Sequence, residues 1–104
     1  MATTKQPKLF DLGQIVATPC ALGTTRYGFI ELMPYLTRHA SGDWGCIDPE
    51  DRAMNDAAVS RGGRIMSAYA IDPSKPCAGH GENCIWVITE ADRSVTTLLL
   101  PFEY

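Results

Sequence analysis

The sequence lacks the features that would assign it to a membrane, an export pathway or a nucleic-acid surface. No apolar run among its 104 residues approaches the roughly 20 residues that a membrane-spanning helix needs. The charged-then-apolar layout of a secretory signal is missing at its start. A basic excess is missing too, since 9 lysines and arginines face 12 aspartates and glutamates, a net charge of -3. We therefore expect a cytoplasmic protein with no membrane partner and no bulk electrostatic binding of nucleic acid.

Catalytic and cofactor motifs of high specificity are also absent, and what remains is the composition of a small globular domain. Apolar residues make up 45% of the chain and charged residues 20%, both near the average for folded domains. A chain of this length builds one core and leaves no room for a second domain. We expect one domain over residues 1–104, with residues 1–8 as a flexible polar arm.

Local signals predict two short helices in the first part of the chain. Thr18-Pro19 is a helix start, with threonine as the cap and proline at the first position, and Gly28 would end that helix. A second helix is expected from about Glu31 to about His39. Its apolar residues follow one helical face at i, i+3, i+4 and i+7, namely Phe29, Leu32, Met33 and Leu36.

The clearest helix start lies further along, at Asp48-Pro49. Glu50-Asp51 follows in the first turn, where the helix macrodipole favours acidic side chains, and Gly62-Gly63 ends this third helix. A narrow stripe of small apolar residues predicts that the helix packs closely against a sheet, and its members are Ala53, Met54, Ala57 and Ala58.

The end of the chain is rich in strand signals. Arg64–Ile71 is predicted to be one strand, and Cys84–Thr89 and Ser94–Leu100 flank the polar tetrad Glu90–Arg93 as the two arms of a β-hairpin. We expect this hairpin at the centre of the sheet, and a further short strand or turn at Gln14–Ala17. The predicted class is α+β, with three short helices followed by a three- to four-stranded antiparallel sheet.

Several short stretches form a recognisable pattern over residues 12 to 104. They are Leu12–Pro19, Arg38-His39 with Gly42–Gly45, Glu50-Asp51 with Asn55, Gly63-Arg64 with Ser67 and Tyr69, and Trp86–Thr97 followed by Leu99-Leu100-Pro101 and Tyr104. In these stretches the chain resembles a small bacterial family carried on plasmids, integrative elements and phages, often labelled "plasmid-related protein" or type I restriction endonuclease subunit M. The resemblance implies a mobile-element setting and an anti-defence role, and it implies no established activity. Cys20, where the family pattern has glycine, departs from it.

Acidic residues around the third helix are the first candidate for binding a partner. A turn with two glycines holds Asp43 and Trp44, and the helix start holds Asp48, Glu50 and Asp51. Such a patch could imitate phosphates, although helix capping and a solvated helix face explain several of these acids equally well. We also expect Trp44 to pack on the core. The sequence predicts a surface at these five residues that contacts a protein, a host defence complex.

A second candidate set consists of polar residues that the fold would bring together if the second helix lay across the sheet. Its arrangement would be similar to the small metal-independent ribonucleases of the barnase and RelE-toxin type, with His39 as general acid or base and Arg93 stabilising the phosphorane. The alternative, which we favour, is that these residues serve helix ends, ion pairs and strand propensity. The set is His39, Arg93, Ser94, Thr96, Thr97 and Tyr104.

The cysteines offer a third candidate site. Cys77, His80 and Cys84 have C-x2-H-x3-C spacing, and Cys46 or Cys20 could supply the fourth ligand of a tetrahedral zinc ion. The alternative is a flexible insertion with incidental reduced thiols. We expect no cofactor, with zinc as the alternative.

The sequence therefore leaves three functional hypotheses. The leading one is a non-enzymatic binding protein from a phage or mobile element, anti-CRISPR-like or antirestriction, that inhibits a bacterial defence system by occluding a partner surface. The others are a small toxin-like ribonuclease and a zinc-stabilised structural module.

Overall fold

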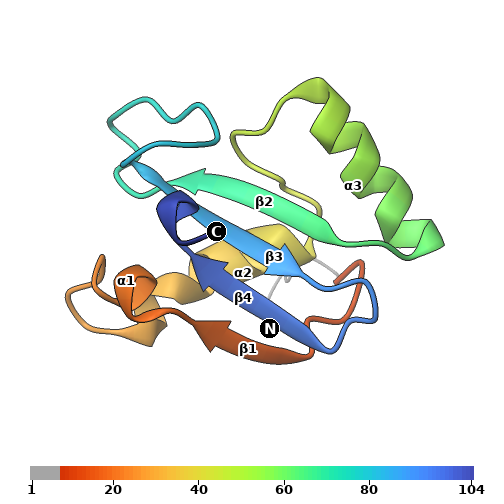
Figure 1. The fold of residues 1–104 in the computed structure, drawn as a ribbon, viewed down its shortest axis with the longest axis horizontal. Helices are drawn as coiled ribbons and strands as arrows, with labels where there is room; N and C mark the ends of the chain where they lie inside the picture. The colour runs from red at the N-terminus through yellow and green to blue at the C-terminus, as the bar shows by residue number, and fades with distance from the viewer. Residues whose placement is uncertain (1–7) are drawn as a thin grey trace, which may run out of the picture.

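The hairpin predicted at the end of the chain forms the centre of a four-stranded sheet (Figure 1). The structure, a computed structural model, describes residues 8–104, so all of the predicted arm except Lys8 lies outside the described residues. Strands β3 (Cys84–Thr89) and β4 (Val95–Leu99) form the hairpin, and β2 (Ile65–Ala70) pairs antiparallel with β3. The predicted α+β class and the central hairpin are confirmed.

The sheet is mixed, and the prediction of an antiparallel sheet is wrong in this respect. Strand β1 (Gln14–Ala17) lies on the outer edge of β4 and runs parallel to it, with Gln14 opposite Val95, so the strand order is β1-β4-β3-β2. Gly13 permits this approach, because its φ is +65° and a Cβ there would lie 2.4 Å from the carbonyl oxygen of Arg93. The sequence of a four-residue strand does not indicate whether it pairs parallel or antiparallel with a strand at the other end of the chain.

The first helix is shorter than predicted. Helix α1 (Pro19–Leu22) is a single turn whose cap, Thr18, accepts a hydrogen bond from the amide of Ala21. The hydroxyls of Thr24 and Thr25 donate to carbonyls of this turn, which offers the backbone an alternative to further helix. The predicted end at Gly28 is therefore wrong.

The second helix forms one cover of the sheet. It begins as the 3-10 turn η1 (Phe29–Leu32) and continues as α2 (Met33–Ala40), with Pro34 in the first turn, where it breaks no helical hydrogen bond. Figure 1 shows α2 lying across the back of the sheet. A core forms between them, and it includes Leu32, Leu36, Tyr69, Ile85, Val87 and Leu98.

Helix α3 (Pro49–Arg61) begins at the predicted cap, because the carboxylate of Asp48 accepts the amide of Asp51. It stands beside the edge of β2 and does not cover a face of the sheet (Figure 1). Only Asn55 and Ala58 are buried along its length. The expected close packing of its apolar stripe is wrong for Met54, whose exposed fraction is 68%.

The chain ends in the 3-10 turn η2 (Pro101–Glu103). Because side chains alternate along a strand, Trp86 points away from the face that α2 covers, and its ring contacts Tyr104 with centroids 5.5 Å apart. Among residues 8–104, no helix has the length and apolar composition that crossing a membrane requires.

Candidate functional site

Helix α3 is anchored to the rest of the molecule by side chains on its inner side. Asn55 donates to the carbonyl of Met66 at 2.8 Å and accepts the amide of Met66 at 3.2 Å, so it occupies the edge of β2 as a neighbouring strand would. Arg93 donates to the carbonyl of Ala58 at 2.8 Å and to that of Gly63 at 2.6 Å. These contacts fix the middle and the end of α3 and leave its outer side open.

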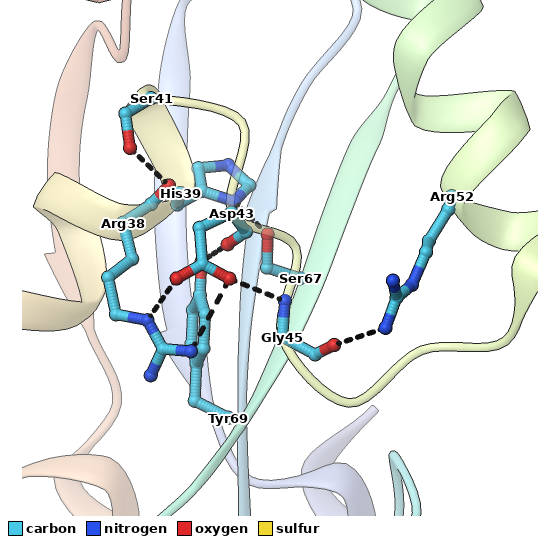
Figure 2. Close-up of polar contacts among 8 residues, drawn as sticks. All are labelled: Arg38, His39, Ser41, Asp43, Gly45, Arg52, Ser67 and Tyr69. Carbon is cyan, nitrogen blue, oxygen red and sulfur yellow. Dashed lines mark hydrogen bonds and ion pairs between the residues drawn. The ribbon is translucent and has the colours of Figure 1, made fainter. Parts of the chain in front are cut away.

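The turn that precedes α3 is fixed by its own polar contacts (Figure 2). The carboxylate of Asp43 accepts two hydrogen bonds from the guanidinium of Arg38, at 2.6 and 3.4 Å, and one from the amide of Gly45 at 3.2 Å. The hydrogen bond from Arg38 holds the pKa of Asp43 below its usual range. The backbone carbonyl of Asp43 accepts the hydroxyl of Tyr69. The carboxylate is thus engaged within the chain.

Trp44 and Arg52 tie this turn to α3. Trp44 is only 5% exposed, stacks near Phe10 with ring centroids 6.1 Å apart, and donates its indole N–H to Asp56 at 3.0 Å. Arg52 donates to the carbonyl of Gly45 at 3.4 Å (Figure 2). The prediction that Trp44 packs on the core is confirmed, and its burial leaves little of the ring for a partner to contact.

The predicted acidic set therefore divides in two. Asp43, Trp44 and Asp48 hold the turn and the helix start together. Glu50 and Asp51 are exposed, and within residues 8–104 neither carboxylate makes a hydrogen bond or an ion pair. These two carboxylates are the ones available to a partner.

A groove of about 570 Å³ runs between α3 and β2. Met54 on the helix and Met66 on the strand contribute its apolar lining. Asp51 lies on its wall at the first turn of the helix, and Arg61 and Arg64 lie near the last turn and the start of β2. The groove is therefore apolar in the middle and opposite in charge at its two ends.

This groove was not predicted from the sequence. Met54 was expected in the packed stripe, and no role was expected for Arg61. The sequence offered one signal: Met54 is the longest apolar side chain on a helix whose other apolar residues are three alanines and Val59. A helix with so little apolar bulk does not bury one long side chain completely. The position of Met66 depends on the edge pairing with Asn55, which no local pattern encodes.

His39 belongs to a buried chain of hydrogen bonds. It is 0% exposed, with Nδ1 2.6 Å from the Ser67 hydroxyl and Nε2 2.9 Å from that of Thr89. The Thr89 hydroxyl lies 2.7 Å from that of Thr96, which donates to the carbonyl of Leu12 at 2.7 Å. A carbonyl only accepts, so Thr96 donates to Leu12, Thr89 donates to Thr96, and His39 Nε2–H donates to Thr89. Ser67 then donates to Nδ1, and every partner is satisfied.

This geometry makes His39 a neutral imidazole with its proton on Nε2. Burial, and then the positive charge of Arg93, lower the pKa of His39 to about 3. Both ring nitrogens are occupied and the ring has no exposed surface, so a phosphodiester has no access to it. His39 links α2 to the sheet.

The structure does not assemble the other predicted ribonuclease residues around His39. Arg93 directs its guanidinium to main-chain carbonyls. Ser94 and Tyr104 are exposed, and within residues 8–104 neither contacts the histidine ring by a hydrogen bond or an aromatic contact. Thr96 joins the same hydrogen-bond chain, one hydroxyl removed from the ring. The predicted set is therefore not arranged as an acid, a base and a phosphate clamp.

Three of the four cysteines lie together. Cys46 and Cys84 both lie near Cys77, and burial, followed by the neighbouring Cys77 thiol, raises the pKa of Cys84 to about 12. His80 is exposed, and Cys20 is exposed in α1. The part of the chain that the structure describes has no group of three or more His, Cys, Asp or Glu side chains arranged to hold a metal ion. Zinc binding by these residues stays the alternative hypothesis.

No family model matches the chain, and comparisons with curated proteins and with solved structures find no significant match. The resemblance to the mobile-element family therefore stays a prediction.

Proposed function

We propose that this chain is a non-enzymatic binding protein from a phage or mobile element, and that it inhibits a bacterial defence complex by occluding one of its surfaces. The observation that supports this most is the presentation of α3. Asn55 anchors the helix on its inner side, whereas Glu50, Asp51 and Met54 remain exposed. A helix that is already formed and fixed loses little conformational entropy when a partner binds it.

The charge of α3 indicates the kind of surface that it fits. Glu50 and Asp51 put two unpaired carboxylates at the start of the helix, in a chain whose net charge is -3. Defence complexes that handle nucleic acid do so through grooves rich in lysine and arginine. Opposite charges accelerate association and select the partner more than they add affinity. The proposed partner surface is therefore a basic nucleic-acid groove of a protein complex.

Affinity purification of the tagged chain from a bacterial host, with nuclease treatment and mass spectrometry, tests this proposal. We expect a stoichiometric subunit of a defence complex. The double variant Glu50→Lys with Asp51→Lys should weaken its binding at least 10-fold, since it turns attraction into repulsion. Glu82→Lys reverses an exposed acid in the loop between β2 and β3 and should leave binding unchanged. Recovery of RNA or ribosomal proteins alone, or equal binding by the double variant, would contradict the proposal.

Asp48 is left out of this variant for a structural reason. Its carboxylate caps α3 by accepting the amide of Asp51 at 2.8 Å. Replacing such a cap costs about 1 kcal/mol of stability, and that loss would mix an effect on folding with an effect on binding. The double variant also replaces two acids in the first turn of α3, where the macrodipole favours them, so a thermal melt of each variant separates a loss of stability from a loss of binding.

A further inference from the structure

We propose that the groove between α3 and β2 binds a short peptide segment of the partner. An apolar side chain of this segment lies between Met54 and Met66, a basic residue faces Asp51, and an acidic residue faces Arg61 and Arg64. This inference rests on the proposed function, because it takes the partner to be a protein.

The middle of the groove fits an apolar side chain. Its volume of about 570 Å³ lies within the roughly 300–1,000 Å³ typical of sites that enclose small ligands. Met54 is 68% exposed and Met66 is half-buried, so both residues retain surface that a partner can cover. Methionine side chains are flexible and polarizable and adapt to the shape of what they contact.

The ends of the groove fit opposite charges. Within residues 8–104, no ion pair engages Asp51, Arg61 or Arg64, and the Arg64 guanidinium lies 5.3 Å from the centre of the Tyr104 ring. An arginine that has no carboxylate partner can take one bidentately from a ligand. The two ends therefore define the direction of a bound segment, from basic to acidic.

The spacing of these charges sets the length of the segment. Asp51 and Arg61 are ten residues apart on one helix, a rise of about 15 Å. An extended peptide covers that distance with about five residues. The expected motif is thus basic, any, apolar, any, acidic, with the apolar residue at its centre.

Two observations exclude other modes of binding. Addition of a strand to β2 is blocked at the groove, because Asn55 already occupies the amide and the carbonyl of Met66. A nucleic-acid strand in the groove would meet the carboxylate of Asp51 along with the arginines, and it would leave the apolar lining unused. A peptide that binds through its side chains needs no hydrogen bond to the edge of β2, and it can use both the apolar lining and the charged ends of the groove.

Selection of a displayed library of random 12-residue peptides on the intact protein tests the inference. Enriched sequences should contain the basic-apolar-acidic motif. Fluorescence anisotropy then measures the binding of a synthetic peptide with this motif. The peptide should bind Met54→Glu and Arg61→Glu at least 10-fold more weakly than it binds the wild type. Met33→Glu changes an exposed methionine on α2, and Arg26→Glu an exposed arginine before η1. Both controls should bind as the wild type does.

Absence of the motif, or equal binding by Met54→Glu, would overturn the inference. The subunit recovered in the purification above separates the two proposals. If Met54→Glu and Arg61→Glu bind that subunit normally while the double variant at Glu50 and Asp51 does not, the groove inference fails and the proposed function stands. If no subunit is recovered while motif peptides bind the groove, the proposed function fails instead.

Discussion

The buried histidine predicts a specific loss of stability in mild acid. In the folded chain, His39 donates from Nε2 and accepts at Nδ1, so a second proton would break the bond from Ser67. Its pKa falls from 6.5 to about 3 on folding. Below pH 6.5 the unfolded chain therefore binds a proton that the folded chain does not, and stability falls as the pH falls towards 3.

The magnitude follows from the two pKa values of His39. Between pH 7 and pH 5 the free energy of unfolding should fall by about 2 kcal/mol, and the full loss below pH 3 approaches about 5 kcal/mol. Asp43, Asp72 and Asp92 also have lowered pKa values in the folded chain. Protonation of these carboxylates therefore destabilises the fold as well, at a more acid pH than the titration of His39. That contribution is common to the wild type and to a variant at position 39.

Urea unfolding, followed by tryptophan fluorescence at several pH values between 5 and 7.5, measures this effect. His39→Gln keeps a donor and an acceptor and removes the titration, so its free energy of unfolding should change by less than about 0.5 kcal/mol over this range. His80→Gln alters an exposed loop residue and should keep the wild-type slope. Equal slopes for the wild type and His39→Gln would refute the reasoning, whatever their absolute stabilities.

Three further predictions concern the anchors of α3 and its preceding turn, each measured by urea unfolding. Asn55→Ala leaves the amide and carbonyl of Met66 without a partner and should cost about 2 kcal/mol; a cost below about 0.5 kcal/mol would mean that water replaces the amide fully. Arg93→Ala removes the donors to Ala58 and Gly63 and should also cost about 2 kcal/mol, with Arg93→Lys intermediate; equal loss in both variants would argue against a role for the guanidinium geometry. Gly45→Ala should destabilise the chain more than Gly81→Ala does. Both glycines have positive φ, but of the two only Gly45 has a backbone atom in the way, because a Cβ there would lie 2.0 Å from the carbonyl oxygen of Ala68. Similar losses of stability in the two variants would show that the turn relaxes.

Features of the fold that depend on neighbouring residues could be predicted from the sequence. Thr18-Pro19 and Asp48-Pro49 start helices as expected, because capping is decided within one turn. The β-rich run Cys84–Thr89 likewise predicts a strand, and the structure has one at these residues. The direction of β1 was not predictable, because it depends on how Gly13 meets the turn after β3.

The candidate site was predictable only in outline. The sequence indicates acids at the start of α3, and it does not reveal that Asp43 is engaged by Arg38 while Glu50 and Asp51 are not. Pairing of this kind depends on contacts between elements. The same holds for His39, whose catalytic or structural role depends on burial that only the packed sheet supplies.

Amide hydrogen exchange of the complex with the recovered partner, compared with the unbound chain, tests whether α3 is the binding surface. We expect slower exchange in α3, residues 49–61, with no change in β1, because α3 presents the exposed acids and β1 lies at the other edge of the sheet. Protection confined to β1, or unchanged exchange throughout α3, would contradict the claim that this helix is the binding surface.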